Sequence, residues 1–283
     1  MPAKPFDTYF GGKEAAGAYQ KIINEIRPHE VFVSAFLGNC AVLRHMAPSP
    51  FRYGIDLDND VVRAWGMAGW GTLCRPEQDL PKGTPGTRES PSEAVRLIHG
   101  PAQEWLPRII NHPRHEGQRI VVYCDPPYML RSRKSGQPRY ACEMTDVAHL
   151  GFLNMIEGVA ALPNVDVIVS HYPDPVYDDY LEGWRTVDFR VATRQGGAAE
   201  RLYCNFSHTD GKLHDYRYVG EGKHERYRLR KRMAAALIGK LAAMEPRKRQ
   251  AMLHWLAAEV AGMGEKTLSE SPVAATDALV NLA

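Results

Sequence analysis

The sequence predicts an α/β fold in which buried strands alternate with helices. Three apolar runs rich in β-branched residues, at 31–36, 120–123 and 165–170, have the length and composition of strands covered on both faces. Between them lie stretches whose apolar residues recur at helical spacing, such as 16–26 and 147–159. Buried strands that alternate with helices indicate an open, mostly parallel sheet.

The chain begins with a glycine-containing loop, residues 5–13, followed by a helix that Pro28 ends. Gly11 and Gly12 allow close backbone approach or a positive φ. Lys13 stands at the helix start, where a positive charge opposes the helix dipole. It is therefore a candidate for binding a ligand anion, and the alternative is a lysine that faces solvent.

The next segment resembles a nucleotide-receiving unit. The strand at 31–36 leads into a glycine turn at 37–40 and a helix that opens at 41–45, so a ligand can lie at the helix N-terminus. A second strand, 51–56, ends in an acid. Asp56 is placed to bind ribose hydroxyls; its alternative role is to cap the following helix.

The central strand ends abruptly in Asp125-Pro126-Pro127-Tyr128, because proline cannot continue a strand ladder. At the carboxyl end of a sheet, this set suits the exocyclic amine of a nucleobase. Asp125 and the Pro126 carbonyl can each accept an N–H, and Tyr128 offers a face for base stacking. The alternative is a Pro-Pro turn with a solvated aspartate.

Residues 66–118 read as an insertion between strands, with Gly83–Pro91 as an irregular loop and 93–99 and 103–110 as short helices. We expect either a substrate-recognition element or a variable lid there. After the central strand, a basic loop would suit phosphates, unless it is only solvated. Its candidate residues are Arg131, Arg133, Lys134, Arg139 and Tyr140.

The last part of the sheet is predicted to be a hairpin of strands at 184–191 and 201–206, joined across 195–197. Thr145 is expected to cap the helix before the strand at 165–170. His171 follows that strand and is read as a structural histidine in preference to a substrate contact.

The composition changes at Gly222. Residues 222–265 read as a helical hairpin with a basic entry, which Pro246 divides, and 266–283 as a disordered tail. Such a basic run is either a solvated face or a nucleic-acid contact.

The composition of the chain limits the class of protein that it can be. The chain has 283 residues, a formal net charge of +2 and five scattered cysteines without a CxxC pair. This argues against a zinc site and a disulfide framework, and for a reducing compartment. We find no signal peptide and no apolar run long enough to span a membrane, so a soluble cytoplasmic protein is expected.

In combination, these motifs resemble the Dam-like class of DNA adenine-N6 methyltransferases, which use S-adenosylmethionine. The resemblance covers roughly residues 5–206. It lies in Tyr9-Phe10-Gly11-Gly12-Lys13, Phe36-Leu37-Gly38, Gly54-Ile55-Asp56-Leu57, Asp125-Pro126-Pro127-Tyr128, Ser170-His171-Tyr172 and Glu200-Arg201-Leu202-Tyr203-Cys204-Asn205.

The resemblance implies a Rossmann-like methyltransferase domain at 1–221, with a mostly parallel seven-stranded sheet, an antiparallel last strand and target recognition within 66–118. Asp56 would bind the ribose and Gly38 would lie beneath the methionine part of the cofactor. Asp125 would contact cofactor and target amine, and Tyr128 would stack on a flipped adenine. The implied cofactor residues are Tyr9, Lys13, Phe36, Gly38, Asn39, Asp56, Leu57 and Asp125, and the implied catalytic residues are Asp125, Pro126, Pro127 and Tyr128.

The implied reaction is direct in-line methyl transfer to duplex DNA after base flipping, without a metal. Cytosine-N4 and RNA adenine methylation are rival reactions. A catalytically weak nucleic-acid-binding protein is a rival of another class, because Ser34-Ala35 and Asn39-Cys40 depart from the family pattern. The sequence leaves open the recognition site, the oligomeric state and whether the context is restriction–modification, a phage or host regulation.

Overall fold

The computed structural model describes residues 2–7, 9–14, 17–74, 92, 94–133, 136–193, 196–207, 212–220 and 222–266. The chain divides into two compact units, Met1–Tyr218 and Val219–Ala283. The first unit contains the sheet and the helices that cover it, and the second is helical.

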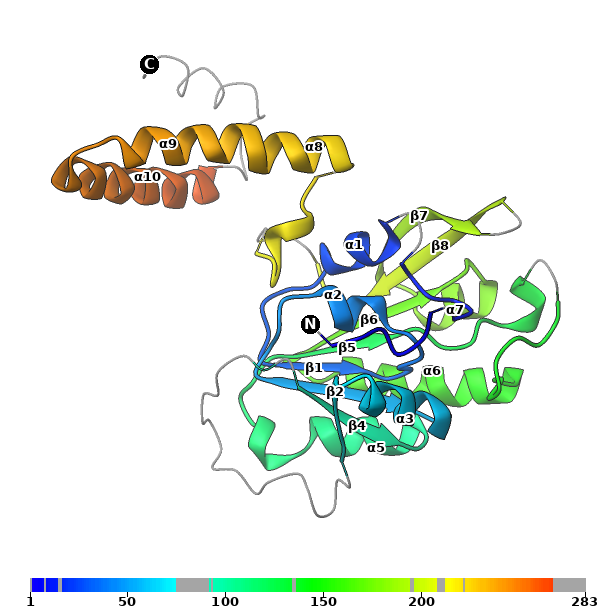
Figure 1. Ribbon diagram of the computed structural model, residues 1–283. Coiled ribbons are helices and arrows are strands. Elements are labelled where there is room, and N and C mark those ends of the chain that lie inside the picture. The colour runs from blue at the N-terminus through cyan, green and yellow to red at the C-terminus, as the bar shows by residue number, and fades with distance from the viewer. Residues whose placement is uncertain are drawn as a thin grey trace. The chain divides into compact units, whose positions relative to one another are not determined.

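In the part of the chain that the structure describes, the first unit is built on one eight-stranded sheet (Figure 1). From β3 to β6 all neighbouring strands are parallel, and β8 runs antiparallel to both β6 and β7. The predicted α/β Rossmann-like fold with an antiparallel last strand is confirmed, although the sheet has eight strands and not seven. Their order is β3 (Gly71–Leu73), β4 (Val95–His99), β2 (Phe51–Asp56), β1 (Val31–Ser34), β5 (Ile120–Cys124), β6 (Val165–His171), β8 (Gly196–Cys204) and β7 (Arg185–Thr193).

Strand β1 lies at the centre, between β2 and β5. Ser34, its last residue, is in register with Gly54 of β2 and Tyr123 of β5. The carboxyl ends of the three strands therefore meet at one edge of the sheet. In open α/β sheets this is the edge at which ligands bind.

Helices cover both faces of the sheet. On one face Ile22, Val42 and Trp65 pack with Val121, and on the other Leu106, Phe152 and Tyr177 pack with Val122. Strands buried in this way need apolar residues at almost every position, which explains the continuous runs in the sequence. The first face carries α1 (Ala18–Ile23), α2 (Ala41–His45) and α3 (Asn59–Met67), and the second α5 (Ala102–Ile110), α6 (Asp146–Ala160) and α7 (Pro175–Tyr180). Among the described residues, 3-10 turns include η2 (Pro113–His115), η3 (Leu130–Ser132) and η4 (Tyr216–Tyr218).

The prediction of a short helix at 93–99 is wrong, because Val95–His99 is strand β4. Val95, Leu97 and Ile98 are buried, and β4 pairs with β2 on one side and β3 on the other. This pairing with distant strands decides the conformation over local preference. The predicted helix at 103–110 is confirmed within α5.

Strands β3 and β4 lie within the predicted insertion at 66–118. That stretch is therefore not a single recognition element, because parts of it complete the sheet. The predicted irregular loop at 83–91 lies outside the described residues.

Strands β7 and β8 pair as a hairpin, as predicted, but β8 begins earlier than expected. Gly196 and Gly197 of the predicted turn lie in the strand, opposite Thr193 and Ala192. Gln195 of the predicted turn lies outside the described residues. Thr145 caps α6 as expected, since its side chain accepts a hydrogen bond from the Ala148 backbone N–H.

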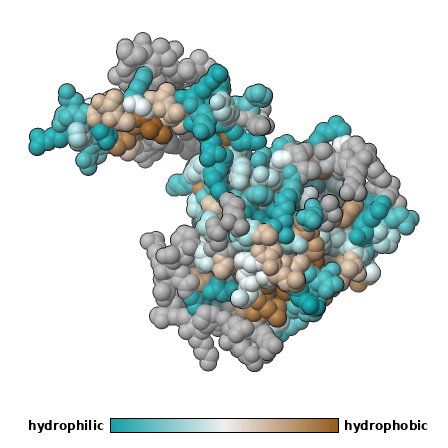
Figure 2. Space-filling view, in the orientation of Figure 1, coloured by the Kyte–Doolittle hydropathy of each residue, from teal (hydrophilic) through white to brown (hydrophobic). Residues whose placement is uncertain are grey.

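The second unit consists of α8 (Lys223–Tyr227), the π-helix η5 (Arg228–Ala234), α9 (Ala235–Ala242) and α10 (Pro246–Lys266). Pro246 begins α10, and the predicted division at 222–265 into a helical hairpin stays a prediction. Hydrophobic surface is visible on this unit (Figure 2). Its exposed apolar side chains include Leu237 and Ile238. The predicted tail lies outside the described residues from 267 onward, and no described helix is both long and apolar enough to cross a membrane.

Candidate functional site

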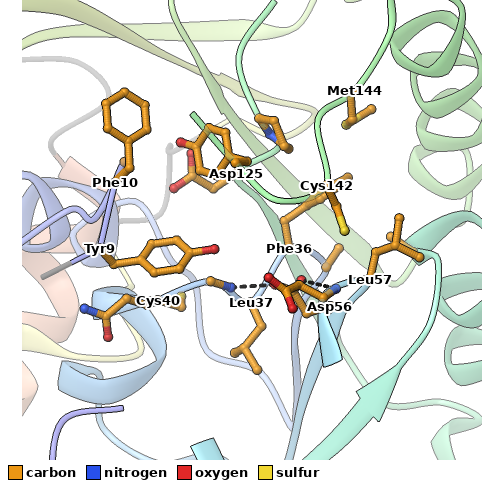
Figure 3. Close-up of a pocket in the computed structure, with 18 of the residues that line it drawn as sticks. Tyr9, Phe10, Phe36, Leu37, Cys40, Asp56, Leu57, Asp125, Cys142 and Met144 are labelled. Atoms are coloured by element: carbon orange, nitrogen blue, oxygen red, sulfur yellow. Dashed lines mark hydrogen bonds between the residues drawn. The ribbon is translucent and has the colours of Figure 1, made fainter. Parts of the chain in front are cut away.

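A cavity of about 410 Å³ opens at the carboxyl edge of the sheet (Figure 3). It lies where β1, β2 and β5 end, and its wall is completed by the N-terminal loop, the start of α5 and the segment 140–144. Its size is within the usual range for small-molecule and cofactor sites.

The structure brings all eight predicted cofactor residues to this cavity. They come from four separate parts of the chain, so only the fold assembles them. The lining residues include Tyr9, Lys13, Phe36, Gly38, Asn39, Asp56, Leu57 and Asp125.

The glycine turn after β1 is fixed from both sides. The Gly38 backbone N–H donates to Asp56 Oδ2 at 2.8 Å, and the Gly38 carbonyl accepts from Trp65 Nε1 at 2.7 Å. Gly38 has φ of 41°, and a Cβ there would lie 3.0 Å from the Tyr9 ring. A larger residue would therefore strain the turn and crowd the Tyr9 ring.

Asp56 stands at the end of β2 and faces the cavity (Figure 3). It accepts backbone hydrogen bonds from Gly38 and Asp58, and burial raises the pKa of its carboxyl group. Asp58, and not Asp56, caps α3 through the Asp60 N–H. A carboxylate has about four acceptor sites, so Asp56 can also accept ligand hydroxyls.

A buried polar cluster lies behind Asp125. Lys13 Nζ is 2.9 Å from Asp125 Oδ1 and 3.3 Å from Glu200 Oε1, and it donates to the Tyr128 hydroxyl. The Tyr128 and Ser170 hydroxyls both donate to Glu200. Lys13 is thus held by carboxylates of its own chain, and its contact with a ligand anion stays a prediction.

In this cluster, burial and the neighbouring charges shift the pKa values of Asp125 and Lys13 in different directions. Burial raises the pKa of Asp125, Lys13 acts to lower it, and Glu200 raises it again, so the pKa lies above its ordinary value. For Lys13, burial acts to lower the pKa, but Asp125 and Glu200 outweigh burial and raise it. Lys13 is therefore cationic, and Asp125 takes up a proton more readily than a solvent-exposed aspartate.

The proline–tyrosine part of the motif differs from expectation. Pro127 lines the cavity, whereas Pro126 is buried and is absent from its lining. Tyr128 is 7% exposed, with its ring centroid 4.4 Å from that of Tyr172 and 4.9 Å from that of His171. Little of the Tyr128 side chain is therefore exposed, and its stacking on a base stays a prediction.

His171 is structural, as expected. It is fully buried, its Nε2 accepts from the Met129 N–H, and its ring stacks on Tyr177 at 4.0 Å. Burial lowers the pKa of His171 to about 3, so the ring is neutral near pH 7. Its role is to fix the chain just after Tyr128.

The basic loop is engaged mainly in ion pairs. Arg133 is 7% exposed and makes a two-pronged ion pair with Glu143 at 2.6 and 2.7 Å. Its predicted phosphate contact stays a prediction. Arg131 pairs in the same way with Asp174. Arg139 is exposed and lies over the Phe10 ring. Tyr140 lines the cavity, and Lys134 lies outside the described residues.

Glu200 and Glu143 are site residues that the sequence reasoning did not single out for a role. Glu200 alternates with Leu202 and Cys204 on β8, and all three are buried. An acid at an inward-facing position of an alternating strand is a signal that could have revealed it. Glu143 lies in an irregular segment and offers no such signal.

Comparison with known proteins adds only distant structural likeness. No family model and no curated protein matches the chain. A precorrin 8w decarboxylase from Methanobacterium thermoautotrophicum is 15% identical, with a TM-score of 0.40, over 73% of this chain and 100% of that one. An rRNA methylase from Streptococcus thermophilus is 14% identical, with a TM-score of 0.37, over 68% and 96%. A protein assigned as a methyltransferase and solved with SAH is 14% identical, with a TM-score of 0.32, over 54% and 30%. With such low values, the function has to be argued from the site itself.

The Arg133–Glu143 ion pair predicts how the stability of the protein depends on pH. Burial alone would raise the pKa of Glu143, but hydrogen bonds and the charge of Arg133 lower it to about 2. A lowered folded-state pKa stabilises the protein above the unfolded value, here 4.5, and the stabilisation is lost as the pH falls toward 2. We expect Glu143→Gln to lower the free energy of unfolding by about 1–3 kcal/mol near neutral pH. Urea unfolding at several pH values measures this, and a difference that does not shrink below pH 4.5 would contradict it.

Proposed function

We propose that the protein is an S-adenosylmethionine-dependent methyltransferase that acts on the N6 amine of adenine in DNA. The observation that carries the proposal is the acidic character of the cavity. Its described charged lining residues are Asp56, Asp58, Asp125, Glu143 and Lys13. Lys13 is paired with Asp125, and Glu143 is paired with Arg133, so Asp56 and Asp58 give the cavity its acidic character. Such a wall disfavours nucleotides with phosphates and favours a nucleoside that carries positive charge.

The donor set of the cavity fits this cofactor. Asp56 suits the two ribose hydroxyls, and Tyr9, Phe36 and Leu57 offer aromatic and apolar surface for the adenine ring. Asn39 lines the same cavity, and its Oδ1 is buried without a hydrogen-bond partner in the described structure. An unpaired buried acceptor is costly, so it supports a ligand that brings a donor, such as the cofactor's ammonium group.

The residues around Asp125 suit an amine as the methyl acceptor. The bound cofactor supplies an electrophilic methyl group on a sulfonium. Asp125 can accept an N–H of the target amine, which favours a lone pair directed away from the ring plane. Lys13 holds the carboxylate in place, and this preorganisation supplies catalysis without later rearrangement.

The choice of DNA adenine rests on the resemblance of the motif Asp125-Pro126-Pro127-Tyr128 and on basic groups of the chain. Arg139 is exposed beside the segment that lines the cavity. In the second unit, Arg228, Lys231 and Arg232 are exposed on one short helical segment. Such groups neutralise backbone phosphates and give binding without sequence preference.

Transfer of a labelled methyl group from S-adenosylmethionine to duplex DNA tests this proposal. We expect label on N6-methyladenine and a fall of about 100-fold or more in Asp125→Ala, because the acceptor for the target amine is lost. Asp188→Asn is the matched control, since Asp188 is an exposed carboxylate on β7 that does not line the cavity. It should leave the rate unchanged.

The product identifies which part of the proposal holds. Label on N4-methylcytosine or on RNA would keep the chemistry and correct the substrate. Folded protein that binds DNA but transfers no label to DNA or RNA would contradict the enzyme and favour a nucleic-acid-binding protein.

The basic segment of the second unit makes a separate prediction. Replacing Arg228, Lys231 and Arg232 with Gln should weaken DNA binding and reduce the slope of log Kd against log salt by about 2–3, because each lost phosphate contact removes about 0.9. Fluorescence anisotropy over a salt series measures the slope. The matched control replaces the exposed Lys21, Arg63 and Arg108 of the first unit with Gln. Equal effects of the two triple variants would show that the second unit is not the DNA contact.

A further inference from the structure

The positive and negative charges of the polar cluster behind Asp125 do not balance. Lys13 is one cation between two carboxylates, Asp125 at 2.9 Å and Glu200 at 3.3 Å. With both acids ionised, the cluster carries one excess negative charge. Lys13 and Glu200 are 6% and 1% exposed, so water screens this charge poorly.

The other groups that face the cluster do not cancel this charge. Tyr123, Tyr128 and Tyr140 are neutral, because burial raises the pKa of each hydroxyl. His171 is neutral because burial lowers its pKa to about 3. The guanidinium of Arg133 is already balanced by Glu143.

The excess charge reaches the cavity through Asp125. Its side chain is 19% exposed and lines the cavity, whereas the Glu200 side chain is 2% exposed and is absent from the lining. Asp125 and Lys13 alone would form a neutral pair. The net negative charge of the cluster at Asp125 is therefore due to Glu200, a residue with no expected contact to any ligand.

We propose that Glu200 makes the cavity select the positively charged sulfonium cofactor over its neutral thioether product. This rests on the proposed function. S-Adenosylmethionine carries one positive charge more than S-adenosylhomocysteine, and an excess negative charge favours the ligand that balances it.

The selection acts at the end of each reaction cycle. Methyl transfer breaks the carbon–sulfur bond, leaves its electron pair on sulfur and forms a carbon–nitrogen bond to the amine, which releases a proton to water. The sulfur thereby loses its charge, and the attraction to the cluster is lost with it. Glu200 acts through Lys13 and Asp125, so it is a positioning residue and not a catalytic one.

Isothermal titration calorimetry on the full chain tests the proposed selection by Glu200, with S-adenosylmethionine and S-adenosylhomocysteine as probes. Glu200→Gln removes the charge but keeps an acceptor for the Tyr128 and Ser170 hydroxyls. We expect this variant to weaken S-adenosylmethionine binding about tenfold. The reason is the loss of the Coulomb attraction between a unit charge and the sulfonium about a nanometre away, at an effective dielectric constant of about 20. Binding of S-adenosylhomocysteine should change less than about twofold, because the ligand lacks the sulfonium charge.

Two variants control for charge and for structure. Glu200→Asp keeps the charge and should preserve the ratio of the two dissociation constants. Asp188→Asn removes an exposed carboxylate that has no contact with the cluster, and it should leave both dissociation constants unchanged.

The pH dependence is a second readout that needs no variant. As the pH falls through the raised pKa of Asp125, the carboxyl group takes up a proton and the excess charge disappears. The preference for the sulfonium should therefore decline from about pH 7 to about pH 5, below the range in which α-amino groups titrate. In Glu200→Gln the Asp125 pKa should fall, because a negative neighbour has been removed, and any remaining decline should move to lower pH.

The outcomes separate this inference from the proposed function. If the wild-type chain binds neither probe, the proposed cofactor is wrong. If it binds both, but Glu200→Gln weakens them equally or leaves both unchanged, the inference is overturned and the methyltransferase proposal stands. If Glu200→Gln does not fold, two other measurements test the inference. They are the ratio of the two dissociation constants in Glu200→Asp and the pH dependence of that ratio in the wild-type chain.

Discussion

The buried ion pairs of Lys13 hold the candidate site together. Lys13 comes from the N-terminal loop, Asp125 from the end of β5, and Glu200 from β8, so one ammonium group joins three distant segments. Removing one partner of a buried ion pair commonly costs about 3–5 kcal/mol, because the other charge stays buried. Here two carboxylates would be left without their cation. The position of Asp125, and with it the chemistry at the cavity wall, therefore depends on this lysine.

The sheet supplies the geometry that this ion pair completes. Because β1 lies between β2 and β5 in parallel register, the Gly38 turn, Asp56 and Asp125 must come to one edge. The backbone N–H of Gly38 is bound by Asp56, so the turn and the acid fix each other. The cavity is thus rigid at its base and acidic at its wall, which suits a cationic nucleoside better than a phosphate-bearing one.

Much of this arrangement could be predicted from short local patterns. The strand ends at Asp56 and Asp125 and the turn at Gly38 are visible because apolar runs stop abruptly at acids, glycine or proline. Strand β4 could not be predicted, since its conformation depends on pairing with β2 and β3. The pairs Lys13–Glu200 and Arg133–Glu143 were also missed, because no local pattern states which charges meet in the fold. These pairs give Lys13 and Arg133 a role in internal support, and Tyr128 packs against Tyr172 and His171. The ligand contacts of all three residues stay predictions.

The central claim is that the cavity between Asp56 and Asp125 binds S-adenosylmethionine. A crystal structure of the full chain with S-adenosylhomocysteine tests it most directly. The account predicts the ligand in this cavity, with its ribose hydroxyls at Asp56 and its sulfur on the side of Asp125. Ligand density at another site, or a ribose turned away from Asp56, would contradict it.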